Sequence, residues 1–123
     1  MSVFNFKRMV KSFGYAFKGL LVAFKEEQNF RFHVVAFVLM LIASFLLKVT
    51  AIEWLILVVV SGAVMGAELV NSIFERIVDV LKPRLHPIVR EIKDMMASVV
   101  LIASFGAIIV GLVIFLPKVI ELF

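Results

Sequence analysis

The segment from Met95 to Leu116 contains 22 consecutive residues without a formally charged side chain. At about 1.5 Å per residue, a helix of that length is about 33 Å long, which is enough to cross the hydrocarbon core of a bilayer. A small water-soluble domain has too little interior to bury this segment within a chain that is 63% hydrophobic and 18% charged. The sequence therefore predicts a membrane protein and argues against a soluble enzyme or a disordered chain.

Two further apolar runs precede this segment. Phe32 to Leu47 contains no formal charge, whereas the run from Trp54 to Phe74 reaches the length of a span only by including Glu68 and Asn71. An ionisable group inside a span usually marks a functional site. We expect an all-α membrane protein with one domain over residues 1–123 and spans at about 30–48, 52–74 and 95–116. Pro83 and Pro87 predict that the second helix ends near Leu81 and that another begins near Pro87.

The basic side chains indicate how these spans are oriented. Eleven of the 13 Lys and Arg residues precede the first span or lie between the second and third, and only Lys48 and Lys118 lie elsewhere. The positive-inside rule therefore places the N-terminus and the segment at about 75–94 in the cytoplasm. Residues 4–26 mix aromatic with basic side chains, which predicts an amphipathic helix on the cytoplasmic membrane surface.

Several familiar chemistries are absent from the sequence. There is no cysteine, which excludes disulfides, thiolate zinc sites and thiol catalysis. The phosphate-binding loop G-x-x-x-x-G-K-[ST], the kinase signatures H-R-D and D-F-G, and the motifs H-E-x-x-H and G-x-S-x-G are also missing. Any phosphate chemistry must therefore use an unrelated constellation of residues.

Four polar side chains share one face of the second predicted span. At 100° per residue, Glu68, Asn71, Glu75 and Asp79 fall within about 80° of one another. Three anions on one stripe repel one another, and burying an anion in hydrocarbon costs several kcal/mol, so a cation or a polar network must offset the cost. For Asp79, an ordinary ion pair at a solvated helix end, with Arg76, Lys82 or Lys93, is an alternative. Glu68 lies too deep in the span for that interpretation.

A second spaced series lies near the N-terminus. Gly19, Ala23 and Glu27 recur every fourth residue, and small residues at such spacing allow close approach between helices. Glu27 then stands at the end of a packing face, although a simple ion pair with Arg31 at i+4 explains it equally well. Either histidine, taken alone, is more often an ordinary polar residue than a ligand.

The segment Glu68-Leu-Val-Asn71-Ser-Ile-Phe-Glu75, with Asp79 four residues further on, resembles a known signature. It is the E-x-x-N-[ST]-x-x-E-x-x-x-D pattern of the small bacterial integral-membrane lipid kinases, the diacylglycerol kinases and undecaprenol kinases. Lys93-Asp94 stands at the expected distance, as does the series from Gly19 to His33. The resemblance extends from about Arg8 to about Ile102.

The resemblance implies a homotrimer of three-span subunits in the bacterial inner membrane, which transfers the γ-phosphate of ATP to the hydroxyl of a membrane lipid and has no nucleic-acid partner. Glu68 is then the expected general base, and Glu27 and Glu75 the expected ligands of Mg²⁺. The nucleotide is expected to contact Arg8, Tyr15, Asn71, His86, Lys93 and Asp94. The lipid is expected to contact Val22, Ala23, Phe24, Gln28, Phe32 and Ala97.

Residue chemistry is compatible with these roles. A lipid alcohol is a poor nucleophile, so a carboxylate within hydrogen-bonding reach is useful, and Mg²⁺ favours one or two carboxylates with phosphate oxygens. The segment Glu27-x-Asn29-x-Arg31-x-His33 is more similar to the form common in undecaprenol kinases, which makes undecaprenol the expected acceptor and diacylglycerol the alternative.

Two interpretations from other classes remain open at this stage. A small ion-coupled membrane transporter also has a membrane-embedded Glu, but transport does not need the acids Glu75, Asp79 and Asp94. A structural subunit without catalysis is the other. Stabilisation by nucleotide separates a kinase from both, because only a protein that binds the nucleotide in its native state gains stability from it.

Overall fold

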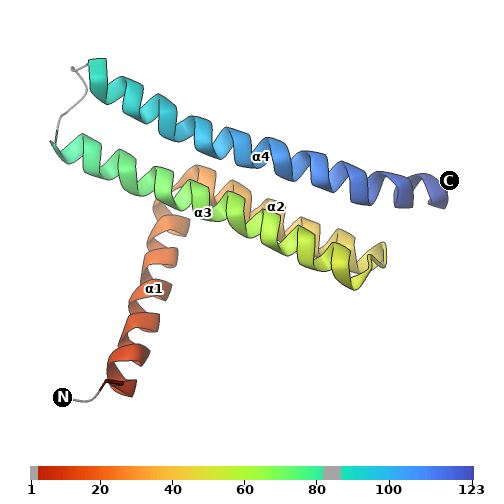
Figure 1. Cartoon of the computed structure of the whole chain (residues 1–123), viewed down its shortest axis with the longest axis horizontal. Coiled ribbons are helices and arrows are strands. Elements are labelled where there is room, and N and C mark those ends of the chain that lie inside the picture. The colour runs from red at the N-terminus through yellow and green to blue at the C-terminus, as the bar shows by residue number, and fades with distance from the viewer. Residues whose placement is uncertain (1–2, 82–86) are drawn as a thin grey trace.

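The computed structural model describes residues 3–81 and 87–123. Four helices follow one another, namely α1 (Phe6–Glu26), α2 (Gln28–Leu46), α3 (Ala51–Leu81) and α4 (Pro87–Leu122). The last three are each long and apolar enough to cross a membrane. The predicted all-α class, with three candidate spans and a separate N-terminal helix, is confirmed (Figure 1).

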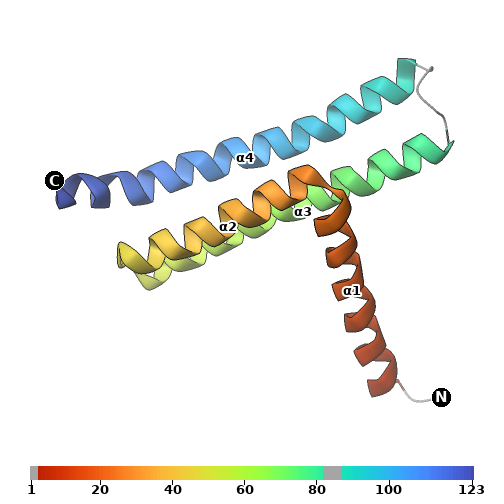
Figure 2. The same cartoon turned by 180° about the vertical axis from the view of Figure 1, so that it is seen from behind.

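α1 stands at a steep angle to the bundle formed by α2, α3 and α4 (Figures 1 and 2). The chain turns at Glu27, which has φ −110° and ψ 106° and separates α1 from α2. The Arg31 guanidinium reaches back from α2, and its Nη1 donates to the carbonyls of Phe24 at 2.9 Å and Lys25 at 2.8 Å. Because a helix end leaves such carbonyls unpaired, these bonds stabilise the turn. We call this end of the bundle the junction end.

α2 and α3 are joined at the opposite end of the bundle, which we call the turn end. Lys48 there has a φ of 53°, in the left-handed region. Thr50 and Glu53 cap α3 reciprocally, since Glu53 Oε1 accepts from the Thr50 N–H at 2.9 Å and Thr50 Oγ1 accepts from the Glu53 N–H at 3.2 Å. Lys118 Nζ lies 3.1 Å from Glu53 Oε1 and ties α4 to the same end.

The packed core is small and lies toward the turn end. Its buried members are Val49, Leu57 and Ile114, and Met40, Trp54, Val110 and Phe115 pack against them. α3 is central to the bundle, since it packs against both α4 and α2. Most large apolar side chains of the three helices are exposed in the single chain, as expected of surfaces that face hydrocarbon or other helices.

α3 and α4 are both longer than the apolar runs that predicted them. α3 continues to Leu81, as the prolines that follow it predict, and therefore carries Glu75 and Asp79 in regular helix. α4 begins at Pro87, a favoured residue for the first helical turn. It also continues past Pro117, where the third apolar run ends. The longer helices bring polar residues of α3 and α4 together at the junction end.

Candidate active site

Glu68 is the most buried charged side chain of the candidate site, with a relative exposure of 3%. His33 on α2 faces it, and the distance from His33 Nε2 to Glu68 Oε2 is 4.0 Å. Within residues 3–81 and 87–123, no Lys or Arg forms an ion pair with Glu68. Its carboxylate instead interacts with the Asn71 side chain and with the charges of Glu75 and Glu27. The Asn71 side chain therefore stabilises the carboxylate, whereas the two neighbouring acids repel it, and this repulsion favours binding of a cation.

Asn71 lies one turn beyond Glu68 on α3 and is also buried. Its Oδ1 has no hydrogen-bond partner among the described residues. A buried polar atom without a partner costs about 1–3 kcal/mol, so it usually has one in the working protein. An unpaired amide oxygen among carboxylates suits either a hard cation or a donor group of a bound ligand. The site is thus built to receive a polar ligand.

Arg76 joins α3 to the turn between α1 and α2. Its Nη2 donates to Glu26 Oε2 at 2.7 Å and to Glu27 Oε1 at 2.9 Å, while its Nε donates to Glu27 Oε1 at 3.2 Å. The ion pair between Glu27 and Arg31 that the i+4 spacing allows is not formed, because Arg31 caps α1 instead. Neither Arg76 nor Glu26 was expected at the site. The only sequence signal for Arg76 was its position directly after Glu75.

A divalent metal was expected at Glu27 and Glu75. The described residues contain no group of three or more His, Asp or Glu side chains that could hold a metal ion by themselves. Mg²⁺ does not require one, since it commonly uses one or two carboxylates and completes its octahedron with substrate phosphates and water. Both acids act on Glu68 electrostatically, and Asn71 adds an unpaired oxygen. These residues fit a metal that arrives with phosphate.

Lys93 and Asp79 form an ion pair between α4 and α3, with 2.5 Å between Nζ and Oδ1. The alternative interpretation of Asp79, as an acid paired at a helix end, is therefore confirmed as a contact. Eleven residues separate Asp79 from Glu68, which places this pair about 16 Å further along α3. Asp94, next to Lys93, is exposed. The charges at the junction end thus form an extended strip rather than a single cluster.

Two other residues expected at the nucleotide, both on α1, are not placed beside Glu68. Arg8 and Tyr15 are exposed on α1, and Lys18 Nζ lies 5.9 Å from the Tyr15 ring centroid. They stand about 28 and 18 Å back along α1 from Glu27, on a helix that leaves the bundle (Figure 1). A single chain does not bring them to Glu68. His86 lies outside the described residues.

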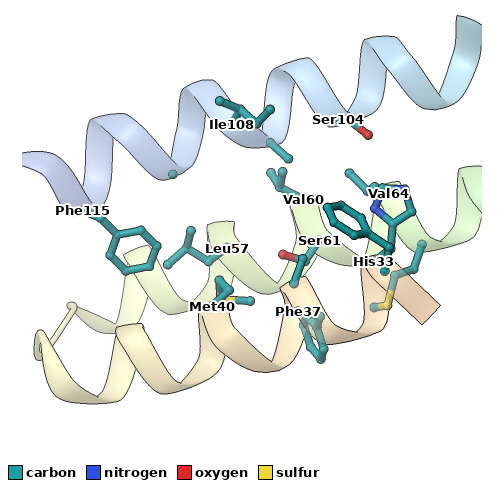
Figure 3. Close-up of a pocket in the computed structure, with 15 residues that line it drawn as sticks. His33, Phe37, Met40, Leu57, Val60, Ser61, Val64, Ser104, Ile108 and Phe115 are labelled. Atoms are coloured by element: carbon teal, nitrogen blue, oxygen red, sulfur yellow. The ribbon is translucent and has the colours of Figure 1, made fainter. Parts of the chain in front are cut away.

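Two apolar pockets flank α3. The first, of about 290 Å³, lies among α2, α3 and α4, with His33 toward its junction end and Phe115 toward its turn end (Figure 3). The second, of about 560 Å³, lies between α1 and α3, and Glu27 and Arg76 contribute its charged side chains. Its other lining residues are Ala16, Gly19, Leu20, Val22, Ala23, Leu69, Ser72 and Ile73. We call them the bundle pocket and the α1–α3 pocket.

The residues expected to face the lipid are divided between these pockets. Val22 and Ala23 line the α1–α3 pocket, whereas Phe32 lines the bundle pocket. Phe24, Gln28 and Ala97 are exposed and line neither pocket.

The expectation of close helix packing at Gly19 is not met within the chain. A Cβ built at Gly19 would have nothing within 4 Å, so no helix of the described chain approaches this residue closely. The space beside it belongs to the α1–α3 pocket.

These features define a multi-pass α-helical membrane protein with acids and an amide gathered at one end of its bundle. A sequence model of the prokaryotic diacylglycerol kinase family matches residues 14–115. The chain is 37% identical to an undecaprenol kinase of Bacillus subtilis over 111 residues, which are 90% of each chain. It is 36% identical to a diacylglycerol kinase of Escherichia coli K12 over 105 residues, 85% of this chain and 86% of that one. A diacylglycerol kinase of Helicobacter pylori is 37% identical over 109 residues, with coverages of 87% and 84%.

The chain belongs to the prokaryotic diacylglycerol kinase family, and it is a lipid kinase. Membership implies ATP-dependent phosphoryl transfer to a lipid alcohol. It favours the enzyme over the ion-coupled transporter and the structural subunit, which the apolar spans alone left open.

Proposed function

We propose that this enzyme transfers the γ-phosphate of Mg-ATP to the hydroxyl of undecaprenol, with Glu68 as the general base. One observation carries the proposal: Glu68 is 3% exposed, without a Lys or Arg partner among the described residues, and interacts with Asn71, Glu75 and Glu27. A buried carboxylate at the edge of an apolar bundle is suited to accept a proton from a lipid hydroxyl. Undecaprenol is favoured by the segment from Glu27 to His33. The relative from B. subtilis is named an undecaprenol kinase.

The lipid enters the α1–α3 pocket from the side. Its apolar walls, including Val22 and Ala23, hold the hydrocarbon chain, and Glu27 and Ser72 line the same pocket as polar residues near which the hydroxyl lies. Phe24, Gln28, Phe32 and Ala97 contact more distant parts of the lipid. Diacylglycerol is the alternative acceptor, because apolar walls discriminate weakly between hydrocarbon chains and several relatives are named diacylglycerol kinases.

In the reaction, the hydroxyl oxygen forms a bond to the γ-phosphorus while the bond from that phosphorus to the bridging β–γ oxygen breaks. Glu68 takes the hydroxyl proton, and ADP leaves with the electron pair of the broken bond. Phosphoryl transfer depends mainly on positioning and on neutralising charge. Lys93, which Asp79 holds at 2.5 Å, contributes a positive point charge toward the phosphates.

The residues that would hold the metal are Glu27 and Glu75. When bound, Mg²⁺ neutralises the phosphate oxygens and orients them. Asn71, His86 and Asp94 complete the nucleotide site. Arg8 and Tyr15 lie on α1, away from the bundle of their own chain, so a neighbouring subunit of a homotrimer would supply them. The exposed apolar faces of α2, α3 and α4 are compatible with such an assembly.

The junction end lies in the cytoplasm, where ATP is present, and the protein is a multi-pass component of the bacterial inner membrane. The positive-inside rule supports this orientation, since 11 of the 13 Lys and Arg residues precede the first span or lie between the second and third in the sequence.

A micellar kinase assay tests the proposed function. The purified protein receives Mg²⁺ and labelled ATP, with undecaprenol and diacylglycerol in separate mixed micelles of matched composition. We expect phosphorylated undecaprenol at the higher kcat/KM. A higher kcat/KM for diacylglycerol would show that diacylglycerol is the preferred acceptor. Inactivity on every lipid alcohol would contradict the proposed kinase function.

A further inference from the structure

Arg76 holds the carboxylate that the proposed function assigns to the metal. Two of its nitrogens, Nε and Nη2, donate to the same oxygen of Glu27, at 3.2 and 2.9 Å. Arg76 follows Glu75, the other proposed ligand, directly on α3. A guanidinium remains charged at all physiological pH values, so Glu27 has a cationic partner throughout that range in this arrangement. Arg76 therefore occupies the position at which a cation is needed.

Arg76 and a divalent cation compete for Glu27. A Mg²⁺ ion binds carboxylate oxygens at about 2.0–2.1 Å, which brings two positive charges close to the guanidinium if both use Glu27 Oε1. At about 5 Å, repulsion between a unit charge and a divalent ion lowers the affinity for that ion by about tenfold even in water. The guanidinium must move away before the metal can bind well.

Glu26 provides an alternative partner for the displaced guanidinium. Arg76 Nη2 donates to Glu26 Oε2 at 2.7 Å, which is the shortest contact of the three. The Glu26 side chain is 59% exposed, compared with 24% for Glu27, so it is the more solvent-accessible of the two partners. Arg76 can therefore lose Glu27 and still retain one charged partner.

We propose that Arg76 is a built-in counter-ion that excludes metal from Glu27 until ATP is bound, and that Glu26 receives the guanidinium in the exchange. The inference rests on the proposed assignment of Glu27 to the metal. In the absence of nucleotide, Arg76 neutralises Glu27, and a free divalent ion binds weakly. The phosphates of ATP add negative charge on the metal side, which shifts the competition toward the metal. Binding of the metal at Glu27 is thereby coupled to binding of ATP.

Mn²⁺ binding without nucleotide tests this inference directly. The free ion is counted by electron paramagnetic resonance in titrations of the full-length protein in detergent micelles. We expect Arg76→Gln to bind Mn²⁺ about fivefold more tightly than the wild type, as removal of a partly screened unit charge predicts. Arg76→Lys keeps the positive charge but lacks the planar guanidinium that bonds two carboxylates at once. The Mn²⁺ affinity of this variant should therefore lie between those of the wild type and Arg76→Gln. If Arg76→Gln does not fold, Arg76→Lys carries the comparison.

Glu26→Gln should have the opposite effect, because Arg76 is then left with Glu27 alone. We expect weaker Mn²⁺ binding in this variant, and a clearly smaller loss when Glu26→Gln is introduced into the Arg76→Gln background. That double-mutant cycle separates the role of Glu26 as a partner of Arg76 from its direct attraction for the ion. Lys118→Gln is the matched control, since it removes a cation from the ion pair with Glu53 at the turn end and should leave Mn²⁺ binding unchanged.

Equal or weaker Mn²⁺ binding in folded Arg76→Gln and Arg76→Lys, including binding too weak to detect in every variant, would overturn the inference. Glu27→Gln distinguishes that result from failure of the proposed metal site. If Glu27→Gln leaves the Mg²⁺ dependence of kinase activity unchanged, the assignment of Glu27 is wrong. If it raises the Mg²⁺ requirement while the Arg76 variants behave like the wild type, only the counter-ion role is wrong.

Discussion

His33 Nε2 lies 4.0 Å from Glu68 Oε2, and this contact joins α2 to the most buried acid of α3. The separation is too long for a direct hydrogen bond, so the imidazole does not consume an acceptor position of the carboxylate. The His33 side chain also forms one wall of the bundle pocket (Figure 3). Glu68 is therefore packed from the α2 side but retains an oxygen that can accept a proton.

Replacing Glu68 by Gln should abolish turnover without unfolding the protein. The amide has the same shape but cannot accept a proton, and loss of a general base commonly lowers kcat by about 10²–10⁴-fold. Initial rates in mixed micelles measure the loss, and nucleotide-dependent thermal stabilisation shows that ATP still binds. Glu121→Gln, at an exposed position of the same type on α4, is the control. A near-wild-type rate for Glu68→Gln would remove this residue as the base.

The Glu75→Gln variant should chiefly raise the Mg²⁺ concentration that the enzyme requires. Glu75 acts on Glu68 electrostatically and is proposed to hold the metal. The glutamine that replaces it has nearly the same volume but lacks the charged carboxylate that would bind the metal. We expect about a tenfold higher half-saturating Mg²⁺ concentration, a typical cost of disturbing a metal site. Titration of kinase activity with Mg²⁺ at fixed ATP measures it, with Glu91→Gln as the exposed control. An unchanged titration would exclude Glu75 as a ligand.

Much of the fold could be predicted because its signals are local. Charge-free runs and prolines are read directly from the chain, and they correctly predict three candidate spans, the end of α3 at Leu81 and the start of α4 at Pro87. The shared face of Glu68 and Asn71 follows in the same way, because one regular helix carries both residues. Helical periodicity is sufficient wherever a contact stays within one element.

Contacts between elements were not predictable by the same means. Arg76 meets Glu26 and Glu27 across 50 and 49 residues, and that contact depends on how the turn between α1 and α2 docks on α3. The alternative of an Arg31–Glu27 pair failed for a related reason. An i+4 pair requires a continuous helix, but Glu27 has extended φ and ψ and separates α1 from α2.

Lys93→Met should weaken ATP binding more than it weakens the fold. The ion pair between Lys93 and Asp79 is partly exposed, and such pairs contribute only about 0–1 kcal/mol to stability. A charge that faces the phosphates contributes much more to nucleotide affinity. We therefore expect a small change in Tm without ligand and a clear reduction in the Tm increase caused by Mg-ATP. Lys118→Met is the control, and an undiminished ATP-induced increase in Lys93→Met would argue against phosphate contact.

The Arg31→Ala variant should destabilise the junction between α1 and α2. Arg31 Nη1 donates to two carbonyls at the end of α1, and hydrogen bonds to charged groups contribute about 1.5–3 kcal/mol when both partners are well placed. Because these bonds are solvent-exposed, we expect a loss near the lower end of that range. Thermal unfolding in detergent and proteolysis of α1 measure the effect. Arg31→Lys should recover part of it, and wild-type stability in Arg31→Ala would show that the caps are dispensable.

Gly19→Leu should identify the pocket that the lipid uses. A Cβ at Gly19 has nothing within 4 Å, and this residue lines the α1–α3 pocket. A leucine there should therefore extend into the space proposed for the ligand, and it also favours helix formation. We expect about a tenfold increase in the KM for the lipid alcohol with an unchanged KM for ATP, since a steric change of this size in a pocket discriminates by about 1–3 kcal/mol. Gly111→Leu is the matched comparison, because it lines the bundle pocket, with Phe115 Cδ2 4.0 Å from its built Cβ. If Gly111→Leu raised the lipid KM and Gly19→Leu did not, the hydrocarbon chain would have to lie among α2, α3 and α4, and the hydroxyl would approach Glu68 from the side of His33.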